Sequence, residues 1–297
     1  MSIRIMVVCA ILLITASRVF AQDYEIRLTR DAEAGEKYEL TVSGSISKQM
    51  TMSSQGQVLQ KNASSFTANL EGTVTVLEID EMKREKKLSL LVSRCLVSSN
   101  GSTKEREALP KDTQVVAQIR DGQKEFLIDG NVVSRDIAEM LGILISLPIS
   151  QATDDDIFGT KEHRKVGDSW PVNGVKGAAD LSSKGIKVDA KDIRGNTKVE
   201  KLIVAGGTNC LQISSKMEMI NITPPLPRGL AVTKSNASAA FSGEFPLDVS
   251  IRPLSEAMTV SMVFVAKGKP APDTPEVTLT MNMEESKHSK QKAVKSN

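Results

Sequence analysis

Aromatic side chains and histidines are scarce in this chain, and their scarcity limits the sites that it can build. Aromatic residues make up 3% of the 297 residues, with one tryptophan and two tyrosines. Glycoside hydrolases use paired carboxylates and usually aromatic platforms for the sugar, so this composition argues against that class. The only histidines are His163 and His288, which are too few for a His-rich metal site.

The motifs of the common enzyme classes are also absent. The chain has no Gly-x-Ser-x-Gly nucleophile elbow, no His-Glu-x-x-His, no Cys-x-x-Cys, and no glycine pattern for phosphates or dinucleotides. His163, the one histidine outside the basic carboxyl end, lies in a polar run at residues 161–164. We therefore expect a protein that is not an enzyme, with no catalytic residues, no cofactor and no metal site.

An excess of charge of one sign is nearly absent as well. The chain has 38 basic and 36 acidic residues, and the two excess cations, Arg4 and Arg18, lie in the first 21 residues. The remainder carries no net charge. Because affinity for phosphates grows with the number of cations presented, we expect no nucleic-acid partner. With 40% hydrophobic residues, the chain can still bury a core.

The amino terminus has the pattern of a secretory signal peptide. Arg4 supplies the positive charge, and residues 5–16 are almost wholly apolar. This run is shorter than the ~20 residues of a membrane-spanning helix, and Arg18 interrupts it, which argues against an uncleaved anchor. We expect cleavage of residues 1–21 after Ala21 and a secreted or periplasmic mature protein. No later stretch has the length of a span, so we expect no transmembrane segment in the mature chain.

Cysteine is rare too. After cleavage only Cys95 and Cys210 remain, in a compartment that permits disulfides. A bridge between them would close a loop of about 115 residues and stabilise the fold by up to ~4–5 kcal/mol in the chain-entropy model. The alternative is two buried free thiols, because spacing in the sequence does not show whether the two Cα atoms lie within bridging distance.

Residues 22–130 have the alternation of antiparallel strands and form a first β-rich half. Tyr38, Leu40 and Val42 fall on one face of a predicted strand. Asp121-Gly122 is a strong hairpin signal between two further short strands. The links between strands are short, which indicates an antiparallel meander rather than parallel βαβ units.

Residues 131–165 contain an amphipathic helix and a polar connection. Ser134 can cap the helix and Pro148 ends it. This helix either packs on the sheet as part of the core or forms a lid over an apolar cavity. Thr153, followed by three aspartates, is typical of a helix cap or a solvated turn rather than a calcium loop. The apolar helix residues recur on one face: Ile137, Met140, Leu141, Leu144 and Ile145.

The strand pattern resumes in residues 166–285, and residues 286–297 are expected to be a disordered basic tail. Residues 35–38 and 167–170 share glycine, an acid, any residue and an aromatic. This weak repeat indicates two similar β-rich halves, although β proteins also share such patterns without duplication. The predicted fold is mainly β, with antiparallel sheets arranged as a curved sandwich or open half-barrels and one central amphipathic helix.

The order of these features resembles a known family. Lys-Val-Gly-Asp-Ser-Trp at residues 165–170 follows a β-rich half and a short helix ending in Leu147-Pro148. The chain is similar in this to a family of uncharacterised secreted bacterial proteins, often lipid-anchored, that share a Val-Gly-Asp-Ser-Trp-like segment before a second β-rich half. The resemblance implies a cell-envelope location. The chain departs from the lipid-anchored members because no lipobox precedes Cys9.

The methionines indicate a binding function. Because a strand alternates faces, methionines two residues apart share a face, and flexible methionines suit an adaptable apolar lining. We therefore expect a carrier for a lipid or other hydrophobic small molecule, with ligand-contacting or core-plug residues at Trp170, Met140 and Leu144. The alternatives are an ordinary Met-rich core, and a structural or interaction component of the cell envelope that binds an envelope protein. The pairs are Met50 with Met52, Met217 with Met219, and Met281 with Met283.

Overall fold

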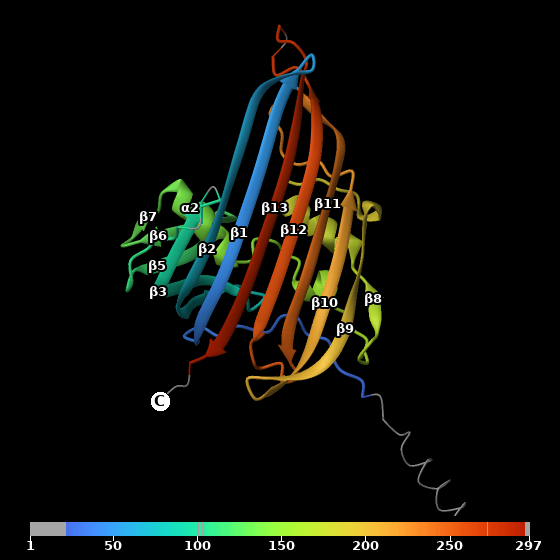
Figure 1. Cartoon of the computed structure of the whole chain (residues 1–297). Coiled ribbons are helices and arrows are strands. Elements are labelled where there is room, and N and C mark those ends of the chain that lie inside the picture. Colours follow the sequence, from blue (N-terminus) through green and yellow to red (C-terminus); the bar gives the residue numbers. More distant parts are fainter. Residues whose placement is uncertain (1–21, 100, 103, 272, 295–297) are drawn as a thin grey trace, which may run out of the picture.

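The computed structural model of the chain is one large antiparallel sheet with a few helices against it (Figure 1). It describes residues 22–99, 101–102, 104–271 and 273–294. The expected signal peptide, residues 1–21, lies outside the described residues. The predicted mainly β, antiparallel fold is confirmed, as one open sheet rather than a sandwich. No helix in the described part has the length and hydropathy that a membrane-spanning helix needs.

The first and last strands pair in the middle of the sheet and join its two halves. The strands are β1 (Lys37–Ser54), β2 (Gln57–Ile79), β3 (Glu85–Ser99), β4 (Arg106–Glu107), β5 (Gln114–Arg120), β6 (Gln123–Ile128), β7 (Asn131–Val132), β8 (Ser169–Pro171), β9 (Ile193–Ala205), β10 (Thr208–Ile220), β11 (Leu230–Pro246), β12 (Ser255–Gly268) and β13 (Val277–Ala293). Their order across the sheet is β7-β6-β5-β3-β2-β1-β13-β12-β11-β10-β9-β8, with β4 beside β3. The links between neighbours along the chain are hairpins or short loops, except for the helical connections from β7 to β8 and from β8 to β9.

Helices cover one face of this sheet. They are α2 (Arg135–Leu144), α3 (Asp154–Phe158) and α4 (Gly174–Ser183), and they lie behind the strands in Figure 1. The face of β1 that carries Tyr38, Leu40 and Val42 points toward α2, and we call this side of the sheet the covered face. The opposite side, the open face, carries mainly Ser, Thr and charged residues, because alternate residues of a strand point to opposite sides.

The covered face carries three apolar clusters. The first joins β1, β2, β3 and β5 to α2, and Leu70, Leu141 and Leu144 are among its most deeply buried members. The second lies under α4 and contains Met217, Met219 and Phe264. The third packs the segment before β1 against β10 around Trp170. Each half of the sheet therefore has its own core, with helices only over the flanks.

The predicted helix is confirmed as α2, and Met140, Leu141 and Leu144 on its apolar face are buried. The cap predicted at Thr153 is also present, as a capping box in which its side chain accepts from the Asp156 backbone and Asp156 accepts in return. A further helix, α4, lies inside the second β-rich half. Its sequence contains two glycines and little apolar periodicity, so no pattern indicated it.

The disordered tail predicted at residues 286–297 is wrong for its larger part. Strand β13 continues to Ala293, pairing with β1 on one side and, as far as Lys290, with β12 on the other. The ladder needs only backbone groups, so a lysine-rich segment can fill it. The lysine-rich composition favours disorder, but Lys287 and Ser289 lie on the same face as Met281 and Met283 at the two-residue spacing of a strand.

Candidate functional site

The middle of the covered face is the least filled part of the interior. Met258 on β12 is 42% exposed there, although it points to the same side as Val42 (1%) and Ile213 (0%) on the flanks. We call the incompletely buried residues of this strip the central lane. The lane lies on β11, β12 and β13, between the parts of the sheet under α2 and α4. It consists of Ala239, Phe241, Glu256, Met258, Val260, Met283, Glu285 and Lys287.

One end of the central lane is lined with methionine. Met50 lies opposite Met281 across β1 and β13, and Met283 lies opposite Met262 on β12. Met50, Met281 and Met283 are only partly buried against the second cluster. All three predicted methionine pairs lie in strands and point to the covered face. Such a surface of soft, unbranched side chains can adapt to ligands of irregular shape.

The other end of the lane leads to a small polar cavity. It lies between β1, β12 and β13 and the carboxyl end of α2, and its volume is about 70 Å³. Its polar lining residues are Tyr38, Glu85, Ser146, Glu256, Lys287, Ser289 and Gln291. Leu144 of α2 and several side chains of the first cluster form its apolar wall. The space holds a few waters or one small polar group, and not a whole apolar molecule.

An arginine network holds two residues that line this cavity, Tyr38 and Glu85, and we call it the floor network. Arg252 donates from Nε and Nη2 to both carboxylate oxygens of Glu36, each at 2.8 Å, and its Nη2 lies 2.7 Å from Oε1 of Glu85. Its guanidinium also stacks over Tyr38, with 4.0 Å between Cζ and the ring centroid. Burial raises the pKa of Glu36, but the hydrogen bonds and charge of Arg252 outweigh it and hold that pKa below its usual value. Glu36 is therefore ionised at neutral pH, and Arg30, which also contacts it, gives the network two cations and two carboxyl groups.

Glu256 and Lys287 differ from this network because neither has an ion-pair partner among the described residues. Nζ of Lys287 donates to Oγ of Ser146 at 2.6 Å. Burial, reinforced by the charge of Asp154, raises the pKa of Glu256 to about 7. Burial also lowers the pKa of Lys287 to about 8, although the charge of Glu256 opposes this shift. Two groups that change charge near neutral pH thus face one cavity.

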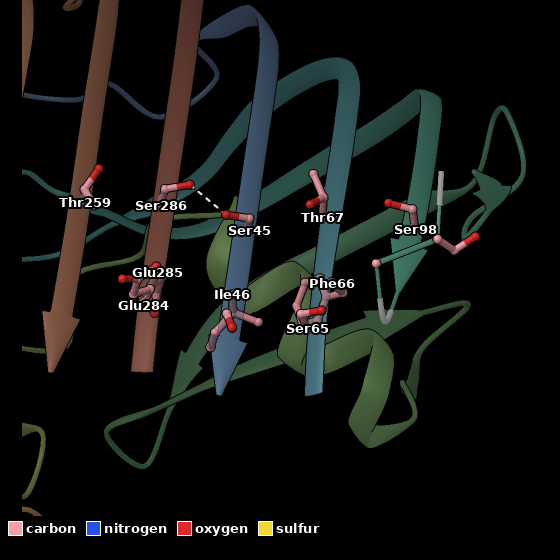
Figure 2. Close-up of a pocket in the computed structure, with 13 residues that line it drawn as sticks. Ser45, Ile46, Ser65, Phe66, Thr67, Ser98, Thr259, Glu284, Glu285 and Ser286 are labelled. Atoms are coloured by element: carbon pink, nitrogen blue, oxygen red, sulfur yellow. Dashed lines mark hydrogen bonds between the residues drawn. The ribbon is translucent and has the colours of Figure 1, made fainter. Parts of the chain in front are cut away.

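A wider groove lies on the open face, across β12, β13, β1, β2 and β3 (Figure 2). Its volume is about 380 Å³. Side-chain hydroxyls form a row across the strands, and Ser45 and Ser286 hydrogen-bond to each other at 2.8 Å. The row consists of Thr259, Ser286, Ser45, Thr67 and Ser98. This groove offers hydroxyl groups to solvent and does not suit an apolar ligand.

The residues predicted as ligand contacts or core plugs all lie in the cores. Trp170 is 4% exposed, and its Nε1 donates to the backbone oxygen of Phe158 at 2.8 Å. The guanidinium of Arg164 lies 5.6 Å from the centroid of its ring. Met140 and Leu144 belong to α2 and are buried between this helix and the sheet. Only Leu144 reaches the polar cavity, so the sequence pointed to the neighbourhood of the site rather than to its polar groups.

Cys95 and Cys210 are both buried and free. They lie on β3 and β10, with five strands between them in the sheet order. At ~4.8 Å per strand the path across the sheet is roughly 29 Å, far beyond the ~7 Å that a disulfide spans between Cα atoms. The proposed bridge therefore does not form in this structure.

Comparisons with known proteins find no near relative. No protein-family model and no curated sequence matches the chain. A structure concerning lipid–protein interactions in lipovitellin aligns with 90% of this chain and 26% of that chain, at 6% identity and a TM-score of 0.37. OccK7 of Pseudomonas aeruginosa aligns over 88% and 100%, at 8% identity and a TM-score of 0.25. An outer membrane channel of Pseudomonas putida F1 aligns over 89% and 97%, at 7% identity and a TM-score of 0.21.

The chain thus spans about a quarter of the lipovitellin chain that it matches. At TM-scores this low, none of these likenesses bears on function.

Proposed function

We propose that this protein is a non-enzymatic carrier of an apolar molecule, secreted or periplasmic and belonging to the cell envelope. The signal-peptide pattern of residues 1–21 and the resemblance around residues 165–170 support the location. The central lane supports the carrier function. It is a strip on the covered face, mostly apolar with three charged residues toward one end, that neither α2 nor α4 covers.

The exposure of the lane is the observation that carries the proposal. A sheet packed only for stability fills its covered face, as this one does around Leu70 and Ile213. Around Met258 the same face stays open, and the adjoining methionines are only partly buried. An apolar ligand seated here would gain ~0.8 kcal/mol for each methylene group that it removes from water.

A matched pair of substitutions on β12 tests the proposal. Met258→Asp places a charge in the lane, whereas Val263→Asp places one on the open face at a similar exposure of 37%. We expect solvent extraction and mass spectrometry of the wild-type protein to release an apolar molecule in near-stoichiometric amount. The Met258 variant should retain less than a tenth of it, and the Val263 variant should retain it all.

An equal content in both variants would place the ligand elsewhere. A bare wild-type protein that also binds no added lipid would end the carrier proposal. It would favour the second candidate, an interaction component of the envelope. That candidate has support from the exposed Val58 (63%) and Leu59 (55%) near the β1–β2 turn, where apolar side chains are free to contact a partner.

A further inference from the structure

The covered face of β13 changes from apolar to polar along its length. Leu279, Met281 and Met283 are followed on the same side by Glu285 and Lys287. At ~3.3 Å per residue, Met281 and Lys287 are ~20 Å apart along the strand. A single extended acyl chain of medium length fits within this distance. The lane therefore has the polarity and the dimensions of a track for a one-chain amphiphile.

Lys287 is the positive group at the polar end of the track. In the floor network, Arg30 and Arg252 contact Glu36, and Arg252 also contacts Glu85, so two cations and two carboxylates balance each other. Lys287 makes no ion pair with any described residue, and its one hydrogen bond goes to the hydroxyl of Ser146. An ammonium group has three donors, so Lys287 can serve a further acceptor in the cavity.

Other groups around this ammonium also suit an anionic acceptor. The Ser289 hydroxyl and the Gln291 side chain line the same cavity and can donate hydrogen bonds. The hydroxyl of Tyr38 is already used, because it donates to Glu85 at 3.3 Å. A carboxylate has two oxygens with about four acceptor sites, and hydrogen bonds from charged donors are the stronger ones. The cavity, at about 70 Å³, has room for a head group of this size.

Two carboxyl groups in the cavity oppose an anion, Glu85 and Glu256. Glu85 is paired with Arg252, whereas Glu256 has no ion pair with a described residue, so protonation of Glu256 removes the unpaired opposition. With a pKa raised to about 7, Glu256 is largely neutral below that pH and can then donate a hydrogen bond. The other charged groups that act on this pair are Asp154 from α3, Lys124 from β6, Glu285 on β13, and Glu85 and Arg252 of the floor. Below pH 7 the cavity is therefore more positive than above pH 8.

We infer that the ligand is a single-chain amphiphile with a carboxylate head group, of the fatty-acid class. Its head group lies in the polar cavity against Lys287, and its chain runs along the central lane toward the methionines. This inference rests on the carrier function proposed above and adds the chemistry of the head group.

The test compares three ligands with the same twelve-carbon chain, namely laurate, dodecanol and dodecylammonium, titrated calorimetrically at pH 6.5 into the delipidated mature protein. Laurate should bind at least tenfold more tightly than dodecanol, and dodecylammonium most weakly. Lys287→Met should weaken laurate binding at least tenfold and change dodecanol binding less than twofold. Lys290→Met, on the open face of the same strand, should change neither.

The outcomes separate the inference from the function on which it rests. Equal binding of laurate and dodecanol, or tightest binding of dodecylammonium, overturns the carboxylate inference and leaves the carrier function standing. Binding of none of the three overturns the carrier function itself. Should Lys287→Met fail to fold, the wild-type pH profile decides. Laurate affinity should fall at least fivefold from pH 6 to pH 9 with dodecanol affinity constant, and a flat laurate profile overturns the inference.

Discussion

At the scale of single residues, Arg252 holds three separate segments together. It pairs with Glu36 before β1 and Glu85 at the start of β3, and it covers the ring of Tyr38. Its side chain is 12% exposed. Arg252→Met would leave the part-buried Glu85 without its cation and Glu36 with Arg30 alone, so we expect a loss of ~3 kcal/mol in the free energy of unfolding.

Urea denaturation of the variant measures this loss, and the exposed pair Arg27–Glu25 supplies the control. Both side chains of that pair are 56% exposed. Arg27→Met should cost less than ~1 kcal/mol, as exposed ion pairs do. If the two variants lose similar amounts, the floor network does not stabilise the fold in the way proposed.

Another single residue, Glu256, makes the stability of the protein depend on pH. Its pKa in the folded protein is about 7, against 4.5 ordinarily, so between these values the folded state binds more protons than the unfolded state. The free energy of unfolding therefore falls as pH rises from 4.5 to 7. Lys287, with its pKa lowered to about 8 from 10.5, makes it rise again between pH 8 and pH 10.5.

Replacing the carboxyl group removes the first of these slopes. Glu256→Gln should flatten the decline in the free energy of unfolding between pH 4.5 and 7. Between pH 4 and pH 7.5 the variant should therefore lose less stability than the wild-type protein loses. Urea titrations at several pH values measure the slope. Glu218→Gln, at an exposed position on the open face of β10, should keep the wild-type profile, and an unchanged slope in Glu256→Gln would refute the assignment.

At the scale of elements, helix α2 and strand β1 fit together through a glycine. A Cβ atom at Gly44 would lie 2.8 Å from Cγ2 of Ile143 and 3.2 Å from Cδ2 of Leu144. Gly44→Ala should therefore push α2 off the sheet and cost ~1–3 kcal/mol. Gly142, inside α2, has open space around its Cβ position, so Gly142→Ala should stabilise the helix by ~0.5–1 kcal/mol. Thermal unfolding measures both variants. The midpoint should fall for Gly44→Ala and rise for Gly142→Ala, and a shift in the same direction for both would contradict this packing.

The elements that the sequence predicted are those with strong local signals. The Asp121-Gly122 turn adopts positive φ angles of 50° and 73°, as its hairpin requires. The alternation of Tyr38, Leu40 and Val42 and the helical spacing from Ile137 to Leu144 also correspond to observed elements, whereas Ile145 is the extended residue that follows the helix. Helix α4 and the end of β13 were missed, because contacts distant in sequence stabilise them: α4 packs near Ile193, and β13 pairs with β1.

The site was harder to predict than the elements for the same reason. Its apolar end was visible as methionine pairs two residues apart. Its polar end was not, because Arg252, Glu256 and Lys287 converge on Tyr38 and Glu85 only after the last strand joins the first. Lys287 looked like one lysine in a basic tail. The one available signal was the two-residue spacing that continues from Met281 and Met283 to Lys287 and Ser289. Such spacing indicates a strand whose covered face changes from apolar to polar.

At the scale of the whole molecule, the β1–β13 pairing makes the two halves one sheet. The pairs run from Tyr38–Ala293 to Ser53–Thr278, so a continuous ladder of paired strands joins the two halves. Although each half has its own apolar cluster, separating them would break this ladder and open the central lane. We therefore expect both halves to unfold together, in one transition.

Two probes in opposite halves test this expectation. Trp170, the only tryptophan, reports on the second half by fluorescence, and the buried thiol of Cys95 reports on the first half by its reactivity in a Cys210→Ala variant. In urea, both probes should give the same midpoint, and deleting residues 277–297 should abolish both transitions. Two separated midpoints would mean that the halves are independent domains. In that case the polar cavity, which draws residues from both, would be a contact between domains and would open before either core unfolds.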